Sequence, residues 1–255
     1  MSKSNKSGPP RLNRWRKSSD TSVELSEESG VRFLHLGSDL IQSAMRISRP
    51  NDLEVAYTQC MMGFLLFNPT PKHVLMIGLG GGSLAKFIYH RIPEASVIAV
   101  EINPQVVAAA NNFFCLPPED DRFRTVIADG AEYVAGHPEG CDVLIVDGYE
   151  DGTMPEVLGS QSFYEHAFAA LRSNGLMVIN FLGRDRKLAT YLDRIKACFP
   201  GGLLQLKDGE YGNVIVFAFK QSPDRQRLKT LEKRAVDLED RYELPFSRYA
   251  KELTS

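Results

Sequence analysis

Three carboxylates stand within five residues, directly after a short apolar run near the middle of the chain. In the string DGYED, Asp147, Glu150 and Asp151 follow the run DVLIV. Like charges this close together repel one another unless a cation lies among them. The string could therefore hold a cationic or amine substrate, although an exposed acidic turn would have the same composition.

A glycine-rich turn follows an earlier apolar run. In the string VLMIGLGGGSLAKF, glycines occupy positions 78, 80, 81 and 82, directly before a stretch that is typical of a helix. Glycine lets the backbone approach a ligand closely, and a helix N-terminus offers free N–H groups. The turn is compatible with a nucleotide-type site at Gly78 and Gly80, and equally with close packing of a helix on a strand.

Two more acids stand where the next two apolar runs end. Glu101 ends the run VIAVE, and a carboxylate at such a strand end can accept both hydroxyls of a ribose. Asp129 and Gly130 follow FRTVIA, and an acid there could receive the exocyclic amine of adenine. Together with the glycine turn, these acids predict a site for an adenosine-type ligand. A dinucleotide oxidoreductase would leave Asp129 and the DGYED string without a role.

Short, branched, almost wholly apolar runs carry these residues, and helix-like stretches lie between them. Strands that are apolar on both faces and alternate with helices predict a mainly parallel sheet covered on both sides, in a Rossmann-like α/β fold. Two further runs around a GEYGN turn predict an antiparallel hairpin at one edge of the sheet. The five main runs are residues 74–78, 97–101, 123–128, 142–147 and 176–181.

We expect this Rossmann-like, methyltransferase-type domain to cover residues 73–220, with three further parts around it. Residues 1–20 are basic and rich in Ser, Gly and Pro, and they predict a disordered tail. Residues 21–72 predict a small antiparallel β-region of two or three strands followed by a buried helix. Residues 221–255 predict a charged amphipathic helix and tail, with the helix packed on its own domain.

The composition limits the class of protein. The chain has 255 residues, of which 43% are hydrophobic and 24% charged, as in an ordinary globular protein. A formal net charge of −2 gives no global basic field for nucleic acid, and no apolar run approaches the length of a membrane helix. The four cysteines lie far apart without a C-x-x-C motif, which disfavours disulfides and zinc. We therefore expect a cytoplasmic protein that binds neither nucleic acid nor membrane.

Taken in order, these strings resemble the spermidine synthase (polyamine aminopropyltransferase) family, within the AdoMet-dependent methyltransferase fold. The strings span residues 31–220 and read AYTQCMM, VLMIGLGGGS, VIAVEINPQVV, FRTVIADG, DVLIVDGYEDG and QSFYEHAFAAL. The resemblance implies a pocket for decarboxylated AdoMet in which Glu101 binds ribose and Asp129 with Gly130 binds adenine. It also implies that Asp147 holds the amine and acts as general base. No metal is implied.

The resemblance places two more residues in the amine site, and it is imperfect. Glu150 would be the second acid of the amine-holding loop, and Tyr57 the tyrosine of the same site. Thr58 stands where the family has a histidine, and the DGYED loop lacks the family's proline. Gly81 stands where the family has an acid that meets the aminopropyl ammonium of the donor. Without that acid, the carboxylate of intact AdoMet meets no repulsion there.

Three classes of function therefore stay open. An aminopropyltransferase would move an aminopropyl group from decarboxylated AdoMet to a small diamine or polyamine, and this is the function we expect. An AdoMet-dependent methyltransferase would act on an amine or another small acceptor, and Gly81 favours it. A non-catalytic relative would bind a nucleoside or a polyamine. The resemblance also makes a homodimer one expected state of the protein.

Overall fold

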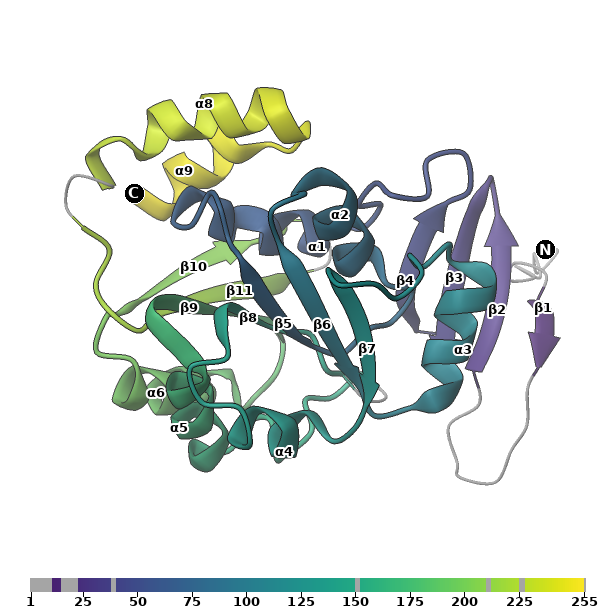
Figure 1. The fold of residues 1–255 in the computed structure, drawn as a ribbon, viewed down its shortest axis with the longest axis horizontal. Helices are drawn as coiled ribbons and strands as arrows, with labels where there is room; N and C mark the ends of the chain where they lie inside the picture. The colour runs from purple at the N-terminus through teal and green to yellow at the C-terminus, as the bar shows by residue number, and fades with distance from the viewer. Residues whose placement is uncertain are drawn as a thin grey trace, which may run out of the picture.

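The structure is a computed structural model of the chain. It describes residues 11–14, 23–37, 40–149, 152–209, 212–224 and 228–254. A seven-stranded sheet occupies the centre, and a four-stranded sheet lies at the N-terminal side (Figure 1). None of the helices within these ranges is long and apolar enough to span a membrane.

The central sheet is mainly parallel. Its strands are β5 (His73–Ile77), β6 (Ser96–Glu101), β7 (Phe123–Ile127), β8 (Cys141–Val146), β9 (Leu171–Leu182), β10 (Leu203–Lys207) and β11 (Asn213–Phe219). They lie in the order β10-β11-β9-β8-β5-β6-β7. The pairs from β9 to β7 are parallel, whereas β11 is antiparallel to both β9 and β10. The predicted α/β fold with its antiparallel edge hairpin is confirmed.

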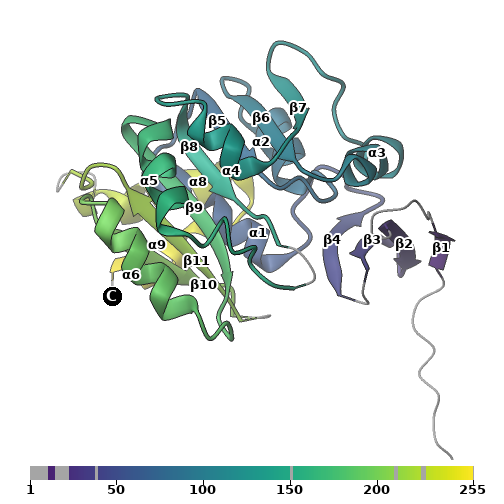
Figure 2. The same cartoon turned by 90° about the horizontal axis from the view of Figure 1, so that it is seen from below.

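Helices cover both faces of this sheet (Figures 1 and 2). One face carries α1 (Ala56–Met61), the short 3-10 helix η1 (Met62–Leu66), α2 (Ser83–Arg91), α8 (Leu231–Tyr242) and α9 (Phe246–Thr254). The opposite face carries α4 (Gly130–Ala135), α5 (Gln161–Ala170) and α6 (Leu188–Cys198). Each layer encloses its own hydrophobic core. Because both faces are covered, β8 and β9 are apolar along most of their length.

The small sheet is antiparallel and contains β1 (Arg11–Arg14), β2 (Val23–Glu28), β3 (Val31–Leu36) and β4 (Ile41–Arg46). It packs on α3 (Pro104–Phe113), where Leu25 and Leu34 share a buried cluster with Val106. It has four strands where the sequence predicted two or three, because Arg11–Arg14 also pairs with β2. Those residues belong to the expected disordered tail, and the rest of 1–20 lies outside the described residues.

The amphipathic helix near the C-terminus packs on its own domain, as expected. Leu231, Ala235, Leu238 and Tyr242 are buried, and the Tyr242 ring lies 6.1 Å from that of Phe87 in α2. Leu228, which the pattern assigned to the same apolar stripe, is exposed, and a turn at Thr230 separates it from α8. The following helix α9 was not predicted.

The parallel strands bring the candidate residues to one edge of the sheet. The chain leaves β5, β6, β7 and β8 at their carboxyl ends, and each of these ends carries one of the predicted features. At Gly78 the chain turns with φ +91°, and a Cβ there would lie 2.3 Å from the carbonyl oxygen of Asp147. Only glycine lets the turn after β5 approach the end of β8 this closely.

Candidate active site

A cavity of about 1040 Å³ opens at this edge, between the central sheet and the small sheet. The site residues predicted from the sequence line it wherever the structure describes them: Tyr57, Gly78, Gly80, Glu101, Asp129, Gly130 and Asp147. Glu150 lies outside the described residues. The sequence therefore located the cavity, and the side-chain geometry within it decides what chemistry it can support.

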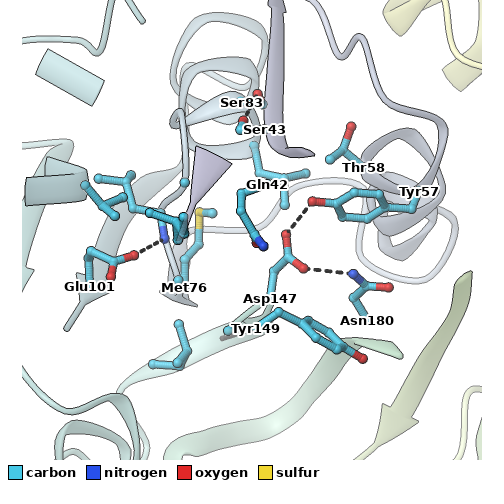
Figure 3. A pocket seen from close by; sticks show the side chains of 18 of the residues that line it. Gln42, Ser43, Tyr57, Thr58, Met76, Ser83, Glu101, Asp147, Tyr149 and Asn180 are labelled. Carbon is cyan, nitrogen blue, oxygen red and sulfur yellow. Dashed lines mark hydrogen bonds between the residues drawn. The ribbon is translucent and has the colours of Figure 1, made fainter. Parts of the chain in front are cut away.

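Glu101 is fixed at one end of the cavity. Its Oε2 accepts a hydrogen bond from the backbone N–H of Leu79 at 3.0 Å (Figure 3). Its Oε1 accepts one from the N–H of Asn103 at 2.9 Å. Burial raises the pKa of this carboxyl, and the backbone N–H groups partly oppose that rise. Each carboxylate oxygen can still accept a further hydrogen bond, so the group suits two neighbouring hydroxyls.

Asp129 lies near Glu101 on the next strand end and caps α4. Its Oδ1 accepts hydrogen bonds from the N–H groups of Ala131 at 2.8 Å and Glu132 at 3.0 Å. No described residue donates a hydrogen bond to its Oδ2, so this oxygen is available to a ligand donor. A Cβ on Gly130 would lie 2.4 Å from Cγ2 of Ile77, which explains the glycine as a packing requirement as well.

Asp147 lies at the centre of the cavity, one residue beyond β8. The hydroxyl of Tyr57 in α1 donates to its Oδ2 at 3.0 Å, and Nδ2 of Asn180 in β9 donates to its Oδ1 at 2.9 Å (Figure 3). Burial raises the pKa of Asp147, and the bonds from Asn180 and Tyr57 pull it partly back. The carboxylate is consequently a stronger base than an exposed aspartate, in a fixed orientation.

Two asparagines that the sequence analysis did not predict as site residues hold Asp147 in place. Nδ2 of Asn213 in β11 donates to Oδ1 of Asn180 at 2.8 Å, and both residues are buried. Because the oxygen of Asn180 is occupied in this way, its nitrogen faces Asp147. A polar residue within the otherwise apolar run LMVINF was the signal that could have pointed to Asn180.

The aromatic and hydroxyl groups around Asp147 are also fixed. Burial and the neighbouring charge of Asp147 raise the pKa of Tyr57 well above its ordinary value, so its hydroxyl stays protonated and remains a donor. The hydroxyl of Tyr149 accepts a hydrogen bond from the N–H of Leu182 at 2.8 Å. Thr58, at the position of the absent histidine, donates to the carbonyl oxygen of Val55 at 2.6 Å. The hydroxyl of Thr58 is therefore bonded at the start of its own helix, α1, and not to Asp147.

The described ranges contain no group of three or more His, Cys, Asp or Glu side chains placed to hold a metal ion. The cysteines, Cys60, Cys115, Cys141 and Cys198, are all free. The polar side chains that line the cavity are carboxylates, amides and hydroxyls, together with the guanidinium group of Arg184. They suit the binding of a nucleoside at Glu101 and Asp129, and proton transfer at Asp147.

Comparison with known proteins places these features in context. The family profile described as the spermine/spermidine synthase domain matches residues 54–181. Polyamine aminopropyltransferase of Chromobacterium violaceum is 44% identical over 231 residues, which cover 91% of this chain and 88% of that protein.

Solved structures share the fold. A spermidine synthase in complex with the transition-state analogue AdoDATO superposes with a TM-score of 0.68 at 22% identity, covering 87% of this chain and 79% of that one. Human methyltransferase-like protein 13 in complex with SAH superposes with a TM-score of 0.65 at 28% identity, covering 74% of this chain and 93% of that one. The predicted Rossmann-like, methyltransferase-type fold is confirmed.

Proposed function

This chain belongs to the spermine/spermidine synthase family, and on that premise we propose that it transfers an aminopropyl group from decarboxylated AdoMet to a small diamine or polyamine. The family resemblance read from the sequence is thereby confirmed. The observation that carries the proposal is the geometry of Asp147, which is held by two hydrogen bonds in the same cavity that Glu101 and Asp129 line. The methyltransferase and non-catalytic alternatives are not favoured, because the relative that matches 91% of the chain is named an aminopropyltransferase.

The donor would be held by its adenosine half. Glu101 accepts the two ribose hydroxyls, since both of its oxygens are fixed and retain acceptor capacity. Asp129 accepts the exocyclic amine of adenine through Oδ2, beside Gly130. Gly78 and Gly80 let the backbone lie close to the rest of the nucleoside, because neither has a side chain and both turn with positive φ.

Asp147 acts as the general base. An alkylammonium group has a pKa near 10, so the acceptor must lose a proton before it can attack. The carboxylate of Asp147 takes that proton, and the freed lone pair of the nitrogen forms a bond to the methylene carbon beside the sulfonium. The bond between that carbon and sulfur breaks, and its electron pair stays on sulfur. The products are a secondary ammonium and a neutral thioether.

Much of the rate enhancement would come from positioning. Tyr57 and Asn180 each donate to one oxygen of Asp147, and Asn213 fixes Asn180, so the base does not turn away from the amine. Tyr57 also lines the acceptor side, and Glu150 is assigned there through the family resemblance. A homodimer, a cytoplasmic location, the absence of a metal and the absence of nucleic-acid binding stay predictions.

The test is a product analysis by mass spectrometry. The purified protein is incubated with decarboxylated AdoMet and, in separate reactions, with 1,3-diaminopropane, putrescine, cadaverine or spermidine. We expect at least one of these amines to gain an aminopropyl group in step with the release of 5′-methylthioadenosine. If no amine is converted, while parallel reactions with intact AdoMet give methylated amines, the protein is a methyltransferase and the proposal is wrong.

A further inference from the structure

The stretch of the cavity between the nucleoside end and Asp147 carries no negative charge among the described residues. Four carboxylates line the cavity as a whole: Glu54, Glu101, Asp129 and Asp147. Glu101 and Asp129 lie at the nucleoside end, and Asp147 is the proposed base. Glu54 is neutralised by Arg46, whose Nε donates to its Oε2 at 3.0 Å. The tail of a bound sulfonium donor, the part that carries its ammonium group, therefore meets no unpaired carboxylate among the described residues of this stretch.

Two buried hydroxyls form that neutral wall. Oγ of Ser43 in β4 lies 3.4 Å from Oγ of Ser83, the first residue of α2, and Ser83 donates to the carbonyl oxygen of Ala44 at 3.5 Å. Both contacts are at the long limit of a hydrogen bond, so the hydroxyls retain capacity for a ligand. Gln42 lines the cavity beside them (Figure 3). A hydroxyl can donate to a carboxylate as readily as it accepts from an ammonium.

Gly81 cannot gain a carboxylate without rearrangement of this wall. A Cβ at position 81 would lie 2.7 Å from Cδ1 of Phe114 and 2.8 Å from Oγ of Ser43. Phe114 is fully buried, and its carbonyl oxygen accepts a hydrogen bond from Nζ of Lys86 at 2.7 Å. The space in which an acidic side chain would begin is therefore filled by a fixed ring and a serine.

A buried cation lies behind the same wall. Lys86 is fully buried in α2, where its Nζ lies 3.2 Å from Sδ of Met45, and no carboxylate in the described part of the chain pairs with it. Burial lowers the pKa of Lys86 to about 8, so the amine is still mostly charged at neutral pH. Together with the N-terminal end of α2, this charge favours an anion at Ser43 and Ser83 over a second cation.

We propose that the donor pocket binds intact AdoMet, carboxylate included, about as tightly as decarboxylated AdoMet, with Ser43 and Ser83 facing the tail. The inference rests on the proposed function, because that function places the sulfonium between Glu101 and Asp147. It goes beyond it by making intact AdoMet a competitor of the aminopropyl donor. The ratio of the two cellular donors then sets the rate of aminopropyl transfer.

The first experiment is calorimetric binding of AdoMet and of decarboxylated AdoMet to the wild-type protein at pH 7. We expect the dissociation constant of AdoMet to lie within tenfold of that of the decarboxylated donor, or below it. A dissociation constant for AdoMet that is more than tenfold higher overturns the inference. This arm requires no variant, so it decides the question even if a substituted protein fails to fold.

The second experiment compares Ser43→Asp with the matched control Ser43→Asn, which has the same shape without the charge. We expect AdoMet to bind Ser43→Asp at least tenfold more weakly than Ser43→Asn, because the new carboxylate repels that of the ligand. The affinities of the two variants for decarboxylated AdoMet should differ by less than threefold or favour Ser43→Asp. If the two variants bind AdoMet equally well, Ser43 does not face the tail and the inference is wrong.

The failure of this inference and the failure of the proposed function give different results. A protein that transfers aminopropyl groups but rejects AdoMet keeps the proposed function and loses the inference. A protein that binds both donors as expected but converts no amine keeps the inference about the tail and loses the proposed function. In the active protein, added AdoMet should also inhibit aminopropyl transfer competitively against the decarboxylated donor.

Discussion

Asp147 receives one hydrogen bond from Tyr57 and one from Asn180, and both bonds hold its pKa below the value that burial alone would give. The two donors differ in origin, since one comes from the helix before the sheet and the other from a strand within it. A base that must be ionised to act loses its activity as the pH falls through its pKa. The loss of either donor should therefore shift the acidic limb of the pH–rate profile, so the two donors can be tested one at a time.

The substitution Tyr57→Phe removes one of these donors and little else. We expect the pKa of Asp147 to rise, so the acidic limb of the kcat profile should move to higher pH. Above that limb, kcat should fall by about tenfold or less, because the base is retained. The matched control is Thr58→Val, since the Thr58 hydroxyl donates to Val55 and not to Asp147. A limb that stays in place in Tyr57→Phe, or that moves to lower pH, contradicts the role given to Tyr57.

At the level of elements, the turn from β5 into α2 depends on the lack of a side chain at Gly78. Gly78→Ala would combine a positive φ with a contact of 2.3 Å between Cβ and the carbonyl oxygen of Asp147. Gly30 also has a positive φ, of +76°, but a Cβ there would meet nothing within 4 Å. A comparison of the two substitutions therefore separates the cost of the positive φ, which both share, from the cost of the steric clash, which only Gly78→Ala has.

We expect Gly30→Ala to lower the free energy of unfolding by about 1 kcal/mol, the cost of the left-handed conformation alone. Gly78→Ala should lower it by at least about 1 kcal/mol more, because the ends of β5 and β8 must move apart. Urea denaturation of both variants measures the difference. Equal losses in the two proteins would mean that the turn is not tightly packed against β8.

Local patterns predicted the elements of the central sheet well, because most of its strands are buried on both faces and stand out as apolar runs. The acids at strand ends were found for the same reason, since each directly follows such a run. Asn180 and Asn213 were missed because their contact depends on register: Ile215 lies opposite Asn180, which puts Asn213 diagonally across on the same face. Sequence spacing alone does not reveal that register.

The errors at element ends have a similar origin. The sequence predicts that the helix-like stretch QSFYEHAFAALRSNG stays helical to its end, but α5 ends at Ala170 and β9 begins at Leu171. Leu171 pairs with Cys141 of β8, and after an irregularity the pairing resumes with Leu176 opposite Val143. The strand Arg11–Arg14 was hidden in a basic, polar segment because its place depends on pairing with β2. In both cases a tertiary contact overrides the local preference.

For the molecule as a whole, the proposed catalytic group costs stability. Burial raises the pKa of Asp147 in the folded protein above its unfolded value, so the folded state favours the protonated acid. The stability that this preference provides is fully present below the ordinary pKa of aspartate and is lost as the pH rises through the raised pKa. At neutral pH the ionised side chain of Asp147 therefore lowers the free energy of unfolding.

Asp147→Asn removes the buried negative charge, and we expect the variant to be more stable than the wild type at pH 7. The advantage should shrink as the pH is lowered toward 4, because protonation of the wild-type side chain increases in that direction. Denaturant titrations at both pH values, on proteins with matching circular dichroism spectra, give the comparison. A variant that is less stable than the wild type at pH 7 would show that the hydrogen bonds to the carboxylate outweigh its burial.

The role of Asp147 in aminopropyl transfer is tested most sharply by the amine-dependent release of 5′-methylthioadenosine from decarboxylated AdoMet, measured for the wild type and for Asp147→Asn. We expect the wild type to release it only when a suitable diamine is present. In the variant we expect a rate at least about 100-fold lower, the contribution of a general base, with donor affinity within a few fold of the wild type. Near-full turnover in Asp147→Asn would mean that Asp147 is not the base.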